Sequence, residues 1–346
     1  MRAPAAVSAA LPEARGEVSD GLLAALTRPA GGPLPDTSAA SADPLGDDAQ
    51  LTLYLCYELH YHGFAGVDAT WEWDPDLLRL RAALERPFLG ALREGTADHP
   101  DLETALGSIL TEPVDGTGVS YFLRDEGELW HLREYAAQRS LYHLKEADPH
   151  AWVIPRLRGR AKAAFVAVEY DEFGAGRADR VHARLFADLM EDLGLDSTYG
   201  RYLDAASAPM LASVNMMSLF GLHRALRGAL VGHFASVEIT SSPGSRRLAQ
   251  AMRRTAAGAA AEHFYAEHVT ADAVHEQVVR RDVIGGLLAD EPSLAGDMAF
   301  GLAATAYVEE RLGDHLTTAW QAGHSSLRTS ATASAVAEAG GSHSRD

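Results

Sequence analysis

The sequence predicts an all-α protein. Apolar residues recur at spacings of three and four along most of the chain, as they do on the buried faces of helices. Runs of β-branched and aromatic residues are too short and too isolated to supply a sheet. With 346 residues, 47% of them hydrophobic, the chain can bury a full core in one large domain or in two smaller ones.

Helices are expected wherever the helical period continues between breaking residues. Pro149, the Gly174 to Gly176 segment and Ser242-Pro243-Gly244 are the clearest breaks. The expected helical ranges are 48–63, 75–95, 101–111, 126–147, 156–172, 178–193, 197–206, 209–241, 244–257, 259–288 and 292–323.

Composition divides the chain into four segments. Residues 1–47 and 325–346 are rich in small and polar residues, so we expect a disordered N-terminal arm and a disordered tail. Between them, the turn-forming stretch from Pro113 to Gly118 separates a small helical domain, 48–118, from a larger one, 119–324. The aromatic residues between Tyr54 and Trp73 are interpreted as packing or as a subunit contact. The small domain is therefore a candidate dimerisation unit, and we expect a homodimer.

Charge and cysteine content exclude several classes of partner. The chain has 48 acidic and 30 basic residues, a net charge of −18, and no basic patch, which argues against binding to nucleic acid or to an anionic membrane surface. Its single cysteine, Cys56, cannot form an internal disulfide. No run resembles a signal peptide or a membrane span, so a soluble cytoplasmic protein is expected.

One stripe of polar residues stands out on a predicted helix near the C-terminus. His268, Asp272 and His275 occupy positions 0, 4 and 7, which point within about 60° of one another. Imidazole and carboxylate groups buried side by side are costly unless a charged group pairs with them. A metal ion is the natural partner, although zinc and a hydrogen-bonded core cluster remain open at this point.

Four more polar residues occupy positions that an ordinary structural role, such as exposure to solvent, explains poorly. Glu238 interrupts an apolar helical run in which Gly221, Gly228 and Gly232 would allow the close approach of a neighbour. Its alternative is an exposed position in the last turn of a helix.

Glu172 and His182 flank a glycine break, and they would diverge by about 80° on a straight helix. Glu146 ends a helix, where the macrodipole disfavours negative charge. Glu169 could replace Glu172 if the helix were shifted.

The order of these residues resembles that of the haem-oxygenase-like diiron oxidases and oxygenases, over about residues 126–322. Members of that family carry a Glu, then a Glu followed by a His, then a lone Glu, then His-x3-Asp-x2-His. The positions that match are Glu146, Glu172, His182, Glu238, His268, Asp272 and His275. The order is most similar to that of the family's diiron N-oxygenase domains. The resemblance implies a helical bundle of about seven core helices with these seven residues as metal ligands.

The resemblance also implies two Fe(II)/Fe(III) ions, O2 as co-substrate, a peroxo-diiron species and an external electron donor, with an electron-transfer protein as a candidate partner. Four carboxylates offset the charge of two ferrous ions, and the absence of thiolates argues against structural zinc and iron–sulfur clusters. Manganese in place of one iron stays open.

The expected function is an O2-activating non-haem diiron oxidase or oxygenase acting on a small amine or amino-acid-like substrate in specialised metabolism. N-oxygenation, desaturation, C–C cleavage and cyclisation remain open as outcomes. We expect Asn215, Met216 and Phe234 near the substrate, and Arg281 as a cation for a substrate carboxylate. The alternatives are a metal-free cofactor- or thiamine-binding relative, a non-catalytic iron-binding protein and, least favoured, a haem protein.

Overall fold

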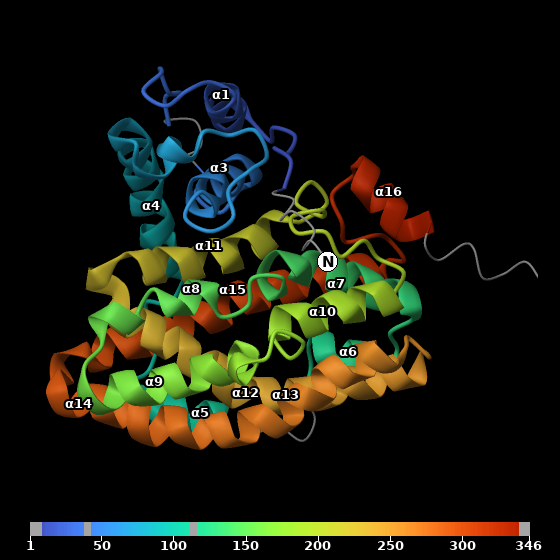
Figure 1. Cartoon of the computed structure of the whole chain (residues 1–346). Coiled ribbons are helices and arrows are strands. Elements are labelled where there is room, and N and C mark those ends of the chain that lie inside the picture. Colours follow the sequence, from blue (N-terminus) through green and yellow to red (C-terminus); the bar gives the residue numbers. More distant parts are fainter. Residues whose placement is uncertain (1–8, 38–42, 111–115, 339–346) are drawn as a thin grey trace, which may run out of the picture.

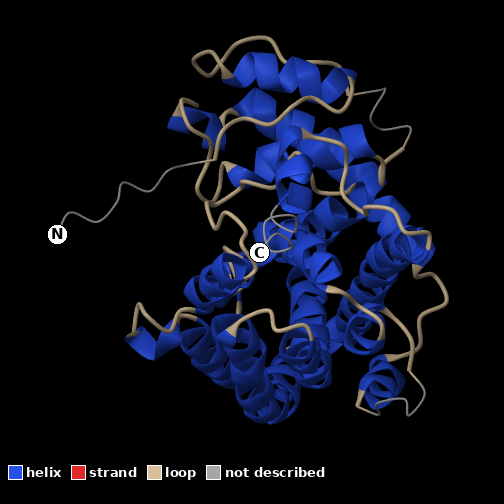
Figure 2. Ribbon diagram, turned by 90° about the vertical axis from the view of Figure 1, so that its right-hand side faces the viewer, coloured by secondary structure: helices blue, strands red, loops and turns tan. Residues whose placement is uncertain are grey.

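The computed structural model describes residues 9–37, 43–110 and 116–338, except for the side chains of 270–273, 331, 335, 337 and 338. Within this part of the chain there are helices but no strands, and a single isolated β-bridge joins Ala9 to Phe64 (Figure 2). The all-α prediction is confirmed. None of the described helices is both long and apolar enough to cross a membrane.

The helices form two groups along the chain. The N-terminal group contains α1 (Glu17–Leu26), α3 (Asp47–Glu58) and α4 (Pro75–Gly95). Seven longer helices follow, as many as were expected for the core: α7 (Leu129–His143), α9 (Gly159–Glu172), α10 (His182–Asp192), α11 (Ala208–Leu222), α12 (Arg227–Arg254), α13 (Ala259–Val278) and α15 (Ala295–Gln321).

Shorter helices connect these elements. The α-helical ones are α5 (Leu102–Ile109), α6 (Val119–Asp125), α8 (Asp148–Ala151), α14 (Gly285–Asp290) and α16 (Ala331–Glu338). The 3-10 turns are η1 (Ala69–Trp73), η2 (Ile154–Arg156), η3 (Gly174–Gly176), η4 (Arg224–Leu226) and η6 (Pro292–Leu294), and the segment η5 (Val279–Ile284) is a π-helix that joins α13 to α14.

The N-terminal group covers one side of the long-helix layer, with α3 lying over α11 (Figure 1). Buried Asn215 on α11 fixes this contact, because its side-chain amide donates to the backbone oxygen and to Oε1 of Gln50, each at 2.8 Å. The apolar cores of the two groups form one continuous cluster.

The expected disordered arm is wrong for the described part of residues 1–47. Val18, Leu22 and Leu26 of α1 are fully buried, and α1 packs on α3. The Asp48 carboxylate accepts hydrogen bonds from the backbone nitrogens of Val18 and Ser19 and so caps α1. The apolar residues of α1 are therefore buried against α3, and this segment does not need an apolar core of its own. Residues 1–8 and 38–42 lie outside the described part.

The expected disordered tail is also wrong where the structure describes it. The backbone nitrogen and the hydroxyl of Ser326 donate to Glu134 Oε2 at 2.8 and 2.7 Å, and Arg328 pairs with Asp47 at 3.1 Å. Helix α16 then packs against α7. Residues 339–346 lie outside the described part.

The expected domain boundary falls partly on residues 111–115, outside the described residues. Before this boundary, α5 makes its main contacts with α12 and α15, not with α1 or α3. The last helix assigned to the small domain therefore lies against the larger helical layer.

The helix pattern differs from expectation at several places. Residues 197–206 form turns, and the range 209–241 contains a break at His223, whose backbone is extended. Conversely, α12 continues through Pro243, where the sequence predicted a break. Proline removes one backbone donor and crowds the preceding turn, but the packing of α12 against α13 and α15 along its length outweighs that local cost.

Helices α12 and α15 touch backbone to backbone through two glycines. A Cβ placed on Gly232 would lie 2.0 Å from the carbonyl oxygen of Met298, and one placed on Gly301 would lie 2.0 Å from that of Ala229. The close approach expected at Gly232 is therefore present. It brings His233, next to Gly232, within 2.8 Å of Thr305, one turn beyond Gly301.

Substitution Gly301→Ala should lower the free energy of unfolding by about 3 kcal/mol or more, because the clash is with a carbonyl group and not with a flexible side chain. Urea unfolding followed by circular dichroism measures this change. Gly90→Ala in α4 is the control: a Cβ there meets nothing within 4 Å, so it should stabilise the protein by about 0.5–1 kcal/mol. Equal effects of the two substitutions would contradict the close packing of α12 and α15.

Candidate metal centre

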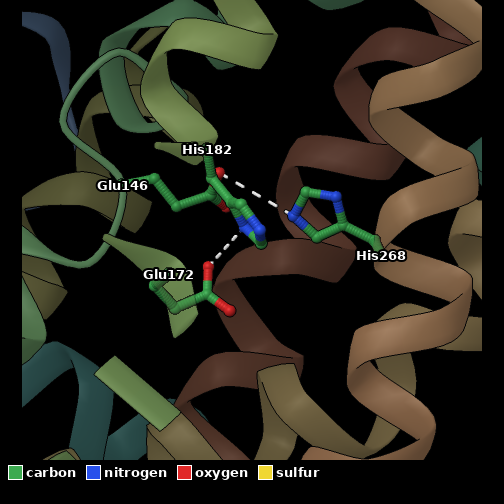
Figure 3. A group of neighbouring side chains, drawn as sticks. All are labelled: Glu146, Glu172, His182 and His268. Carbon is green, nitrogen blue, oxygen red and sulfur yellow. Dashed lines mark ion pairs between the residues drawn. The ribbon is translucent and has the colours of Figure 1, made fainter. Parts of the chain in front are cut away.

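Two groups of buried carboxylates and imidazoles lie in the interior of the long-helix layer. Glu146, Glu172, His182 and His268 form the first group, drawn in Figure 3. Glu172, Glu238 and His275 form the second. Within each group, one possible ligand atom per residue lies within 4.8 Å of all the others. The two groups share Glu172, and together they contain six of the seven residues selected from the sequence.

The glycine break between α9 and α10 brings Glu172 and His182 together. Glu172 is the last residue of α9 and His182 the first of α10. Between them, Gly174 and Ala175 adopt left-handed backbone angles, with φ of 74° and 52°, which interrupt the helix. Nδ1 of His182 then lies 2.5 Å from Oε2 of Glu172. The break re-aims the chain as the sequence suggested.

Glu146 lies just beyond the end of α7, in a turn that contains the left-handed residue Ala147, with φ of 73°. Its Oε1 lies 2.8 Å from Nδ1 of His143. Burial alone would raise the pKa of Glu146, but the charge and hydrogen bond of His143, with His268 and His182, lower that pKa to about 2. Glu146 is therefore a carboxylate, and His143 supports it as a neighbour.

Hydrogen bonding fixes which ring nitrogen of His268 carries a proton in the single-proton form. Its Nδ1 lies 2.8 Å from the backbone oxygen of Phe264, which can only accept, so Nδ1 carries the proton. The lone pair is then on Nε2, which lies 3.9 Å from Oε2 of Glu146. Neither of these two facing atoms makes a hydrogen bond. Such a pair of facing acceptors is suited to a shared cation.

His275 is surrounded by carboxylates. Its Nδ1 lies 3.1 Å from Glu238 and 3.6 Å from Glu172, and its Nε2 lies 3.3 Å from Asp171. Burial lowers the pKa of His275, but hydrogen bonding and charge from Glu238, with Glu172 and Asp171, raise it to about 9. The side chain of Asp272, the remaining predicted ligand, lies outside the described residues.

Glu169, the alternative to Glu172, belongs to neither group. It is buried, neither of its oxygens makes a hydrogen bond, and its Oε1 lies 4.0 Å from Nδ1 of His150. Burial and the charges of Glu172 and Glu238 raise its pKa well above the usual range, so Glu169 is a neutral acid.

A buried ion pair anchors the residue next to Glu146 to the N-terminal group. Nζ of Lys145 lies 2.7 Å from Glu58 Oε2, and both side chains are only 1% exposed. The hydroxyl of Tyr199 donates to the other Glu58 oxygen at 2.7 Å, and the ammonium lies 4.3 Å from the ring centre of Tyr61. Helix α3 therefore helps to hold the turn that carries Glu146.

A cavity of about 1030 Å³ opens onto these groups, with Glu146, Glu172, Glu238 and His268 among its lining residues. None of the four residues expected near the substrate lines this cavity. Asn215 binds Gln50, Met216 and Phe234 are packed in the apolar core, and Arg281 is exposed on η5. The next residue along α11, Met217, faces the cavity instead, since each helical residue turns the side chain by about 100°.

The cavity wall contains a buried histidine pair, His150 with His233, that was not predicted from the sequence. The hydroxyl of Thr305 donates to the backbone oxygen of Gly301, so it accepts from Nδ1 of His233. Nε2 of His233 is then an acceptor for Nε2 of His150, 3.1 Å away. Burial lowers the pKa of both rings, to about 3 for His150 and about 4 for His233. His150 follows a helix break as a lone histidine, so no sequence pattern marks it.

Acid should destabilise the protein through this pair. The pKa of His150 is about 3 in the folded state and 6.5 when unfolded, so the unfolded state binds the proton first as the pH falls. The free energy of unfolding therefore falls progressively below pH 6.5, and protonation of His150 in the unfolded state lowers it by about 2 kcal/mol at pH 5. Urea unfolding in EDTA should show a smaller loss between pH 7 and pH 5 for His150→Asn than for wild type. His324→Asn, at an exposed histidine, should lose as much free energy of unfolding as wild type between pH 7 and pH 5. A loss of that size in His150→Asn would refute the lowered pKa of His150.

Residues 133–310, just over half of the chain, match a family described as iron-containing redox enzymes. The chain belongs to this family. This membership agrees with the haem-oxygenase-like helical fold expected from the ligand order, and it identifies the chain as an oxidoreductase-type protein. A curated relative, the nitrosourea synthase of Streptomyces achromogenes subsp. streptozoticus, is 26% identical over 221 residues. That alignment covers 61% of the chain but 46% of the relative, so the chain spans about half the length of that protein.

The donor atoms in the two groups fit iron. They are carboxylate oxygens and imidazole nitrogens with no thiolate among them, a set that suits Fe or Mn. Three of these atoms, Glu146 Oε2, Glu172 Oε1 and His268 Nε2, are buried and make no hydrogen bond. A buried polar atom without a partner costs about 1–3 kcal/mol, which a bound cation would offset.

Proposed function

We propose that the chain is a non-haem diiron oxidase or oxygenase that uses O2 to oxidise a small amine or amino-acid-like substrate. The observation that carries this proposal is the place of Glu172 in both donor groups. A carboxylate with one oxygen toward each of two adjacent groups is suited to bridging two ions. Family membership supports iron as the metal.

Glu146, His182 and His268 would hold one ion, Glu238 and His275 the other, and Glu172 would contact both. Bound iron would supply O2 activation and electron transfer, with an external donor returning electrons. Asp272 remains a predicted ligand on α13. The charges of the carboxylates would offset those of two ferrous ions, so the loaded site would tolerate burial.

The surrounding residues hold this arrangement before any ion arrives. His143 fixes one oxygen of Glu146, and the backbone of Phe264 fixes the ring of His268. The cavity brings a substrate of moderate size to the exposed edge of the groups, where His233 and Met217 also lie. These residues orient the donors and the substrate.

The substrate class rests on the similarity to the nitrosourea synthase. A nitrosourea carries an oxidised nitrogen, so the relative's name favours N-oxygenation among the outcomes left open by the donor set. We also propose a homodimer built through residues 48–118, where Trp73 is 61% exposed.

Iron titration tests the metal assignment. Under argon, wild type should bind about two Fe(II) per chain, as measured by equilibrium dialysis and metal analysis. Glu238→Ala removes a donor from one group and should leave about one Fe(II), whereas Glu172→Ala removes the shared donor and should weaken both sites.

Glu267→Gln serves as a control, since this half-buried carboxylate pairs with Arg180 and belongs to neither donor group, and it should leave two ions bound. The proposal would be refuted if wild type did not bind Fe(II). It would also be refuted if the iron-loaded protein consumed no O2 with any amine or amino acid in a substrate panel.

A further inference from the structure

The cavity contains an ion pair that the metal assignment does not use. The guanidinium of Arg139 on α7 binds the carboxylate of Glu309 on α15 with two hydrogen bonds, from Nη1 at 3.0 Å and from Nη2. The hydroxyl of Ser213 on α11 also donates to Glu309 Oε1, at 2.7 Å. Three helices therefore fix this carboxylate in the cavity wall.

Both members of the pair face the cavity. Both line it, and the side chains of Arg139 and Glu309 are 15% and 33% exposed. Oε1 of Glu309 accepts two hydrogen bonds and Oε2 accepts one. Since a carboxylate offers about four acceptor sites, Oε2 can accept one more.

The pair lies about one helical turn from two residues that contact the donor region and the cavity wall. Arg139 precedes His143, the partner of Glu146, by four residues on α7. Glu309 follows Thr305, the partner of His233, by four residues on α15. Four residues advance a helix by about 6 Å.

The lining charge favours a cation as the occupant. Apart from the donor groups, the lining residues include five carboxylates, those of Asp125, Glu126, Glu309, Glu310 and Asp314, against the guanidinium groups of Arg139 and Arg247. Arg139 is already engaged by Glu309, and Arg247 donates to Ser120 and lies over the ring of Tyr121. A wall with excess negative charge attracts and concentrates cations.

We propose that the Arg139–Glu309 pair anchors a cationic group of the substrate, an ammonium or a guanidinium, in the cavity onto which the donor groups open. Glu309 accepts the cation, and Arg139 and Ser213 hold Glu309 in place. The inference rests on the proposed function, because it concerns the substrate of that site. It requires a substrate with two functional parts, a cationic anchor and a separate oxidisable position.

A purely structural role is the competing explanation, since the pair also ties α7 to α15. The two roles differ in what the double variant Arg139→Met/Glu309→Met does. Replacing a buried ion pair with apolar residues of similar volume often leaves stability unchanged or higher. The double variant should therefore stay folded while it loses the anchor, whereas a single change leaves a charge uncompensated.

Calorimetric titration under argon, with and without Fe(II), provides the test on the full chain. The probes are 1,4-diaminobutane, 4-amino-1-butanol and agmatine, each compared with neutral 1,4-butanediol. With Fe(II) present, the carboxylates of the donor groups are engaged, so binding reports on the rest of the cavity. Wild type should bind at least one cationic probe at least tenfold more tightly than the diol.

Glu309→Gln and the folded double variant should lose this preference, and Glu262→Gln, at a surface carboxylate paired with Arg253, should keep it. Equal binding of cationic and neutral probes by wild type would overturn the proposal, as would a preference that survives in the double variant. The titration needs no O2. A chain that binds cations through Glu309 but never consumes O2 would refute the oxidase and leave the anchor standing.

Discussion

The burial of carboxylates and imidazoles in an otherwise apolar helical interior is the constraint on which the rest of the structure depends. Glu172 is 6% exposed and His275 3% exposed, and such groups are costly in a core unless they pair with charge. The protein meets part of this cost with internal contacts, such as that between His143 and Glu146, and leaves other donor atoms without a hydrogen bond. The architecture around them serves to keep these atoms close together.

Local backbone strain contributes to this arrangement. Ala147 and Ala175 both adopt left-handed angles, a conformation that costs a non-glycine residue about 1 kcal/mol or more. Each follows a donor residue closely, Glu146 in one case and Glu172 in the other. Tertiary packing maintains both turns, and the buried contact of Lys145 with Glu58 supports the first of them.

The cavity adds a second electrostatic environment beside the donor groups. The neutral pair of His150 and His233 forms one part of its wall, and the charged pair of Arg139 and Glu309 forms another. Because four donor residues also line the cavity, namely Glu146, Glu172, Glu238 and His268, the fold couples the place where a metal would bind to the place where a substrate would lie.

The sequence by itself determined the helical class and the order of the donor residues, because helical periodicity and polar interruptions such as Glu238 are local signals. It also indicated the helix break between Glu172 and His182, since glycines permit the left-handed backbone angles found there. Only the tertiary structure decided which helix faces line the cavity. A helix such as α11, apolar all round, has no face marked by its residues, and Met217 faces the cavity while Met216 does not because of contacts with α3 and α15. The N-terminal arm folds for a similar reason: its few apolar residues are buried on α3, a partner that the composition of the arm does not reveal.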